Sequence, residues 1–183
     1  MRAGSATEML EFLEATEPGS RERIWARVPE ASRAVLEGAG LWIPLEHDGE
    51  LAEAIFEELG DQKTKALYRQ SIHTMVKKPL LEPLVFGMLR VLGYRSLRLV
   101  TIVPKGWGLI FRDFCEPRIE NASESEVTLV LDQVHPEVAA RPVYFRMWEG
   151  IFLGMLDMVC ADGSLDFEVA PDGSRVTGHF TAP

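Results

Sequence analysis

The spacing of apolar residues in the first half of the chain predicts helices separated by short breaks. Between Asp48, a natural N-cap, and Gly60, apolar residues recur at helical intervals at Leu51, Ile55, Phe56 and Leu59. The same spacing predicts helices over residues 7–14, 21–27, 29–37, 67–76 and 81–92. Residues 97–103 have the β-branched side chains of a strand, but their place just before Pro104 favours a helix.

The second half of the chain changes to shorter runs, in which apolar and polar residues alternate. This alternation predicts strands over residues 116–121, 127–134, 165–170 and 175–181, with a long helix over 142–159 between the two pairs. The order of elements predicts one α+β domain over residues 1–183. In this fold class a mainly helical part, residues 1–114, packs on a small antiparallel sheet of strand-strand-helix-strand-strand order within residues 115–183.

Two glycines, Gly150 and Gly154, stand one turn apart on the predicted helix 142–159. A strip without side chains lets another backbone approach closely. In a membrane such spacing is typical of dimerising helices, whereas in a soluble chain it favours tight packing on the sheet.

The net charge of −9 is distributed unevenly along the chain. Residues 1–60 carry 5 basic and 13 acidic side chains, residues 61–114 carry 10 basic and 3 acidic ones, and residues 115–183 carry 4 basic and 12 acidic ones. The overall acidity argues against non-specific binding to nucleic acid or to anionic membranes. The basic middle segment either lies against the acidic flanks or faces outward as a docking surface.

A basic stripe lies within this middle segment, at positions spaced by four: Lys65, Arg69, His73 and Lys77. One interpretation is a surface for an anion or an acidic protein partner, and the other is a solvated helix face that the acidic segments neutralise. A third hypothesis, a helical DNA-binding regulator, depends on this stripe alone.

The sequence predicts a soluble cytoplasmic protein. Charged residues interrupt the first 15 positions, so no signal peptide is expected, and Arg146, Glu149 and Asp157 break up the most apolar stretch. Cys115 and Cys160 lie 45 positions apart and without a paired cysteine motif, which is typical of reduced thiols in a core.

No pattern of reactive side chains points to catalysis. The four histidines are scattered, with no second ligand three or four positions away, and no Gly-x-Ser-x-Gly turn is present. We therefore expect no enzyme activity, no metal and no cofactor. The alternative is an enzyme acting on a small hydrophobic substrate, with His73 or His135 as the base.

Four aromatic residues suggest a binding site. Trp107, Phe111, Tyr144 and Trp148 are candidates for the lining of an apolar cavity that holds a small hydrophobic ligand. Filling the core is the other use of such residues.

Three features carry a resemblance over residues 40–181: the connector Leu41-Trp42-Ile43-Pro44-Leu45, the break at Gly93-Tyr94, and the strand pair leading into helix 142–159. Together they resemble a paralogous family of unknown function that is abundant in myxobacteria. More distantly, the order of elements is similar to the fold shared by the haem nitric-oxide-binding domain, vinyl reductase-like domains and TRAPP trafficking subunits. That resemblance implies a homodimer formed through helices, and a haem or an acyl chain held between helices and sheet.

Only part of this resemblance carries over to the residues. The haem-binding members pair a proximal histidine with a Tyr-x-Ser-x-Arg motif, and the nearest fragment here, Tyr68-Arg69-Gln70-Ser71, has the wrong spacing. The zinc-binding members use cysteine-rich positions, which two isolated cysteines do not supply. The remaining expectation is a non-catalytic sensory, ligand-binding or protein-interaction module, with an apolar cavity for a lipid-like or small hydrophobic molecule.

Overall fold

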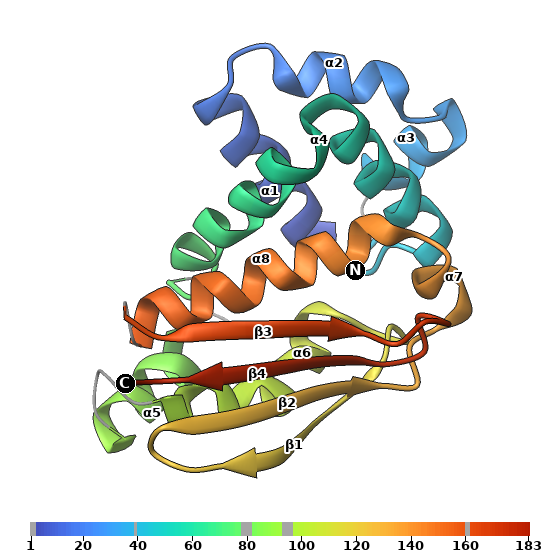
Figure 1. Cartoon of the computed structure of the whole chain (residues 1–183). Helices are drawn as coiled ribbons and strands as arrows, with labels where there is room; N and C mark the ends of the chain where they lie inside the picture. The colour runs from blue at the N-terminus through green and yellow to red at the C-terminus, as the bar shows by residue number, and fades with distance from the viewer. Residues whose placement is uncertain (1–2, 39, 78–81, 93–96, 160–161) are drawn as a thin grey trace.

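Helices make up most of the first part of the chain in a computed structural model, which describes residues 3–38, 40–77, 82–92, 97–159 and 162–183 (Figure 1). The helices before the sheet are α1 Ala3–Thr16, α2 Ser20–Arg27, α3 Glu30–Leu36, α4 Leu45–Met75, α5 Glu82–Leu92, the 3₁₀ helix η1 Leu97–Ile102, and α6 Val103–Ile110. The helix expected over residues 97–103 is therefore present, with 3₁₀ geometry in η1.

A four-stranded antiparallel sheet follows, with strand order β1-β2-β4-β3. Its strands are β1 Glu116–Ala122, β2 Glu126–Asp132, β3 Ser164–Val169 and β4 Val176–Thr181, and between the pairs lie the short α7 Pro136–Ala139 and the long α8 Pro142–Val159. The predicted α+β class, with a helical first half and an antiparallel sheet, is confirmed. The alternation that predicted the strands arises because one face of the sheet is buried.

The buried face of the sheet is formed by alternate residues of its two central strands. Val127, Leu129 and Leu131 of β2 are fully buried, and in the register of the sheet Leu129 lies opposite Gly178 of β4. Gly178 leaves room for Phe152 of α8, because an added Cβ would lie 3.0 Å from its ring. Helix α8 contacts β3 and β4, while η1 contacts β2 and α6 contacts β1, so these helices cover this face together.

Helix α8 lies between the sheet and α4 (Figure 1). Contacts between α4 and α8 join Asp48 to Tyr144, Lys65 to Glu149 and Arg69 to Asp157. The contacts occur in the same order along α4 and along α8, so the two helices run in the same direction. Parallel helices need a long connection, and here it includes η1, α6 and the first two strands.

The glycine strip of α8 packs on α4, so the prediction that it packs on the sheet is wrong. A Cβ added at Gly150 would lie closer than 3.0 Å to the carbonyl oxygen of Lys65, and one at Gly154 would lie closer than 3.0 Å to that of Arg69. The strip is covered within the chain and cannot at the same time form the seam of a homodimer.

Two expectations for the start and middle of α4 need correction. The helix begins at Leu45, directly after Pro44, so Asp48 is not its N-cap but a buried residue of its first turns. The predicted end at Gly60 is a break inside a longer helical segment: Gly60 has φ 74° and ψ 175°, and helix resumes beyond it.

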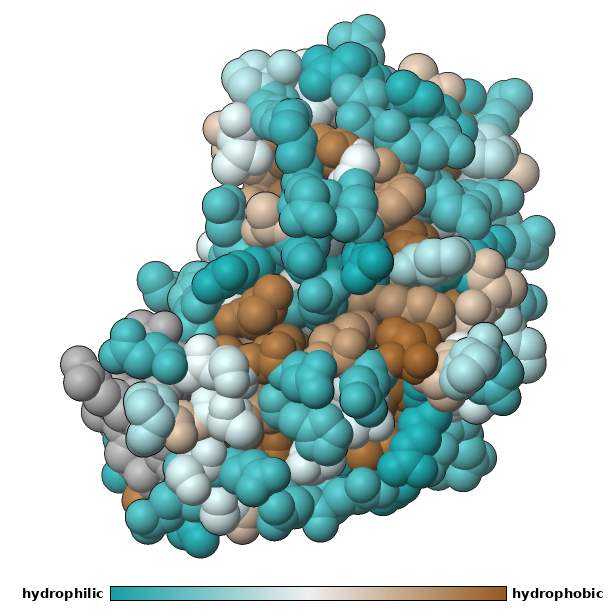
Figure 2. Space-filling model, viewed as in Figure 1, coloured by the Kyte–Doolittle hydropathy of each residue, from teal (hydrophilic) through white to brown (hydrophobic). Residues whose placement is uncertain are grey.

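The surface on the side of the molecule seen in Figure 1 is mostly hydrophilic (Figure 2). Hydrophobic residues appear there mainly in a band across the middle, at the level of α8. Among the described residues, none of the helices is both long enough and apolar enough to span a bilayer.

Candidate ligand-binding site

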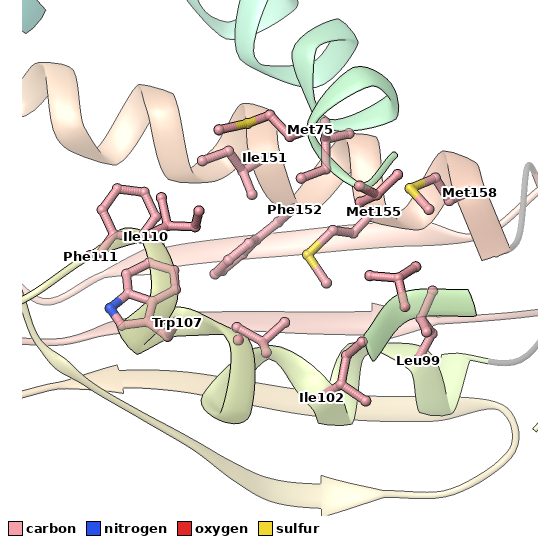
Figure 3. A pocket seen from close by; sticks show the side chains of 15 residues that line it. Met75, Leu99, Ile102, Trp107, Ile110, Phe111, Ile151, Phe152, Met155 and Met158 are labelled. Carbon is pink, nitrogen blue, oxygen red and sulfur yellow. The ribbon is translucent and has the colours of Figure 1, made fainter. Parts of the chain in front are cut away.

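An apolar pocket lies where the end of α4, the segment from η1 to α6, and α8 meet (Figure 3). Its cavity volume is about 110 Å³. Fifteen described residues line it: Ile72, Met75 and Val76 at the end of α4, Val85 of α5, Leu99 and Ile102 of η1, Val103, Gly106, Trp107 and Ile110 of α6, then Phe111, and Ile151, Phe152, Met155 and Met158 of α8.

The helical period of α8 separates its two contact surfaces. Ile151, Met155 and Met158 form a strip that faces the pocket, and each follows a position of the neighbouring strip formed by Gly150, Gly154 and Asp157. One residue is about 100° of rotation at 3.6 residues per turn. The same helix therefore faces the pocket on one side and α4 on the adjacent side.

The pocket lining is apolar throughout its described residues. Its one nitrogen-bearing side chain is Trp107, and in Figure 3 the indole nitrogen lies on the side of the ring away from Met155 and Leu99. No charged side chain is among the described residues that line the cavity. Such a surface offers dispersion contacts and shape, but no fixed hydrogen bond for orienting a polar ligand.

Two of the four predicted lining residues reach the pocket. Trp107 and Phe111 line it, whereas Tyr144 and Trp148 lie behind them and are fully buried. Trp107 contacts Phe111 and Trp148, with ring centroids 4.5 and 5.8 Å apart. Through Phe114 and Tyr144 the contacts close into a ring of five aromatic side chains. Tyr144 and Trp148 therefore support the wall of the pocket rather than face its space.

A buried acid, Asp48, lies next to Tyr144 of this group of aromatic side chains. The hydroxyl of Tyr144 donates a hydrogen bond to Oδ2 of Asp48 over 2.8 Å, and the exposed fraction of Asp48 is 1%. Burial raises the pKa of Asp48, while the Tyr144 hydrogen bond and the charge of Arg141 act in the opposite direction. This contact fixes the start of α4 against α8 and lies outside the pocket lining.

The basic stripe does not act as one outward surface. Lys65 lies 3.3 Å from Glu149, and Arg69 donates two hydrogen bonds of 2.6 Å to Asp157, so both cations pair with acidic residues of α8. His73 and Lys77 are exposed. Their role as an anion or partner surface stays a prediction, while the first two residues of the stripe bind the acidic second half of the chain.

None of the four histidines is among the described residues that line the pocket. Nδ1 of His135 accepts a hydrogen bond from the backbone of Glu137, His179 lies beside Thr128 in the sheet, and His47 lies beside Ser32. His73 is exposed on α4. In the part of the chain that the structure describes, no group of three histidine, cysteine or acidic residues could hold a metal ion.

Cys115 lies next to the aromatic ring, whereas Cys160 is outside the described residues. Burial raises the pKa of the Cys115 thiol to about 12, and the side chain of Trp107 offsets this only in part. In a Cys160→Ser variant at pH 8 we expect Cys115 to react with a disulfide reagent about a thousandfold more slowly than in the urea-unfolded chain, because the thiolate is the nucleophile. Equal rates in folded and unfolded protein would contradict this assignment.

Comparison with known proteins places the fold. No family model matches the chain, and no curated protein matches it, so the myxobacterial family stays a prediction. The unliganded Fe(II) H-NOX protein from K. algicida superposes with a TM-score of 0.69 at 12% identity, over 100% of this chain and 97% of that one.

Two further H-NOX structures also superpose on nearly the whole chain. A point mutant of T. tengcongensis H-NOX gives a TM-score of 0.61 at 14% identity, covering 99% of this chain and 97% of that one. The oxygen complex of an oxygen-binding H-NOX domain related to soluble guanylate cyclases gives 0.59 at 14% identity, over 99% and 94% of the two chains. The chain therefore has the fold of the H-NOX domains, the haem nitric-oxide-binding members of the fold expected from sequence.

Proposed function

We propose that the chain is a sensory ligand-binding module that holds one small, uncharged, apolar molecule in its pocket, and that it does so without haem. The observation that carries this proposal is the pocket of about 110 Å³ with an entirely apolar described lining. The H-NOX structures include an oxygen complex, which supports a sensory role for a chain of this fold.

The described residues do not fit a haem. Haem iron in proteins is held by histidine, cysteine or tyrosine, or by methionine together with histidine. The described lining contains methionine but no histidine, cysteine or tyrosine, and no charged side chain to meet the propionates. The volume is also well below the roughly 300–1,000 Å³ of pockets that take drug-sized ligands.

The volume indicates the size of the ligand. An apolar cavity of about 150 Å³ in another protein stays dry and binds benzene or xenon. A pocket of about 110 Å³ suits a molecule of one small ring or a few carbons, which favours the small hydrophobic ligand over the lipid-like one. Methionine side chains adapt their shape to irregular gaps, so Met75, Met155 and Met158 allow several such molecules to fit.

The position of α8 supports a sensory role. A ligand in the pocket touches the strip with Ile151 and Met155, and the adjacent strip with Gly150 and Gly154 contacts the backbone of α4. Closely packed interfaces transmit small shifts because they contain little free space. A ligand that shifts α8 when it binds therefore acts directly on α4.

Benzene is a suitable probe of the pocket, with methyl-¹³C methionine NMR as the readout. We expect the methyl signals of Met75, Met155 and Met158 to shift on titration, with a dissociation constant of about 1 mM for so small a ligand. The signal of Met147, which is buried outside the pocket lining, should stay in place. Titration with haemin should give no stoichiometric complex by absorbance.

Two matched substitutions on α8 separate the pocket from the rest of the helix. Met155→Trp fills the cavity and should abolish the benzene shifts, whereas Leu153→Trp, outside the lining, should leave them unchanged. Benzene shifts that are equal in wild type and the Met155→Trp variant would refute the pocket as the binding site. A 1:1 haemin complex would refute the exclusion of haem.

A further inference from the structure

The accessible thioethers of the described chain gather around one site. The structure describes the side chains of five methionines, and three of them, Met75, Met155 and Met158, are partly exposed and line the pocket. The other two, Met9 and Met147, have exposed fractions of 5% and 1%. Met75 also lines a second cleft at the surface, between α1 and the end of α4, and Met9 lies on the α1 side of that cleft. The fully buried reference methionine is therefore Met147.

We propose that Met75, Met155 and Met158 are a modification site, at which a hydroperoxide oxidises the thioethers and so closes the pocket to its apolar ligand. This inference rests on the proposed function for the ligand and adds its regulation. The lone pair of sulfur attacks the hydroxyl oxygen of the hydroperoxide, and the S–O bond forms as the O–O bond breaks. The leaving alkoxide, or hydroxide when the oxidant is hydrogen peroxide, takes the proton of the new S–OH group to give an alcohol or water. Sulfur loses two electrons and the peroxide gains them.

The chemistry of the product explains the effect on binding. A sulfoxide is polar and accepts hydrogen bonds, whereas a thioether is apolar. The described lining offers no charged group or hydroxyl to satisfy it, and burial of an unsatisfied polar group is unfavourable. A sulfoxide will therefore turn toward water, or bring water into the cavity, and in either case the surface that an apolar ligand requires is lost. We expect the affinity for benzene to fall roughly tenfold or more.

Methionine sulfoxide is reduced enzymatically, which makes the change reversible. The partial exposure of the three pocket methionines distinguishes the site from damage to a core. Met147 lies on the same helix as Met155 but is fully buried, so native protein should protect it from peroxide. Oxidation of Met147 is therefore the reference against which oxidation of Met155, on the same helix, is compared.

The experiment treats the folded full chain with limiting hydrogen peroxide and measures sulfoxide at each methionine by mass spectrometry of peptides. We expect Met75, Met155 and Met158 to be oxidised first and Met147 to remain reduced, and we expect saturating benzene to slow oxidation at Met155 and Met158. Circular dichroism establishes that the oxidised protein stays folded, and NMR then measures its affinity for benzene.

A Met75→Leu, Met155→Leu, Met158→Leu variant keeps the apolar volume and should bind benzene before and after peroxide alike. Equal oxidation rates at Met147 and Met155, or unchanged benzene affinity in fully oxidised folded protein, would overturn the modification site while leaving the proposed function intact. Loss of binding after peroxide in the leucine variant would also overturn it. Failure of the untreated protein to bind benzene would instead refute the proposed function, and the oxidation pattern would still test the site.

Discussion

Replacing Gly154 with alanine is expected to lower the free energy of unfolding by about 1–3 kcal/mol. The added Cβ would lie closer than 3.0 Å to the carbonyl oxygen of Arg69 and to Cγ2 of Ile72, both on α4. The carbonyl is part of the backbone, so relief requires the two helices to move apart. Urea denaturation measures the loss, which arises even though alanine is intrinsically better than glycine inside a helix by roughly 0.5–1 kcal/mol.

Gly108→Ala is the matched control for this prediction. Gly108 lies within α6, and nothing is within 4 Å of the position that a Cβ would take. The substitution should leave stability unchanged or raise it by about 0.5–1 kcal/mol. Gly150→Ala should behave like Gly154→Ala, because its Cβ would meet the carbonyl oxygen of Lys65. If both α8 variants were as stable as the α6 variant, the close contact between α4 and α8 would be wrong.

Replacing Tyr144 with phenylalanine is expected to lower the free energy of unfolding by about 1.5–3 kcal/mol. The change removes only the hydroxyl, which donates to the buried carboxyl of Asp48, and leaves the aromatic contacts with Phe114 and Trp148 in place. Hydrogen bonds to charged groups contribute more than neutral ones, because the buried acceptor keeps its desolvation penalty when the donor is lost. Urea denaturation at several pH values measures the effect.

The pH dependence of the free energy of unfolding tests whether Asp48 is the acceptor that the Tyr144 hydroxyl stabilises. Burial holds the folded-state pKa of Asp48 above its ordinary value of 3.8, so the folded state binds the proton more tightly than the unfolded state. The contribution of this group to stability is therefore greatest at low pH and declines as the pH rises from 3.8 through the folded-state pKa. Asp48→Asn should remove that decline, and Tyr144→Phe should strengthen it. A decline that is the same in the Asp48→Asn variant would assign it to another group.

The order of helices and strands could be predicted from sequence because it depends on local periodicity. Strand β4 shows this well: Val176, Gly178 and Phe180 are buried, and the residues between them are partly exposed. Helix α8 was expected over 142–159, the bounds that the structure has. Local rules failed where a distant partner decides the outcome. Asp48 looks like an N-cap by its type and place, yet Tyr144, far along the chain, holds it inside the fold.

The glycine strip illustrates the same limit. Its spacing indicates that a backbone approaches closely, but periodicity does not identify which backbone, and the partner is α4 rather than the sheet. Likewise the spacing of Lys65 and Arg69 predicts a basic stripe, while the acidic partners on α8 become visible only when the helices are placed side by side.

The pocket was predicted only in part. Size and ring chemistry drew attention to Trp107 and Phe111, which line it, and to Trp148, which supports it from behind. The methionines were missed as site residues because a methionine at helical spacing is equally typical of an ordinary core. The sequence does contain a signal for them: Ile151, Met155 and Met158 recur at helical spacing, each one residue after a position of the glycine strip.

The parallel arrangement of α4 and α8 also affects how the chain emerges during synthesis. The contacts between them join residues separated by 84 to 96 positions. At roughly 5–20 residues per second, the surface of α4 that α8 covers waits about 4–19 s for its partner to be made. During that interval the side of α4 with Ile72, which α8 covers in the finished fold, lacks this partner, and we expect the nascent chain to present it to chaperones and to other chains.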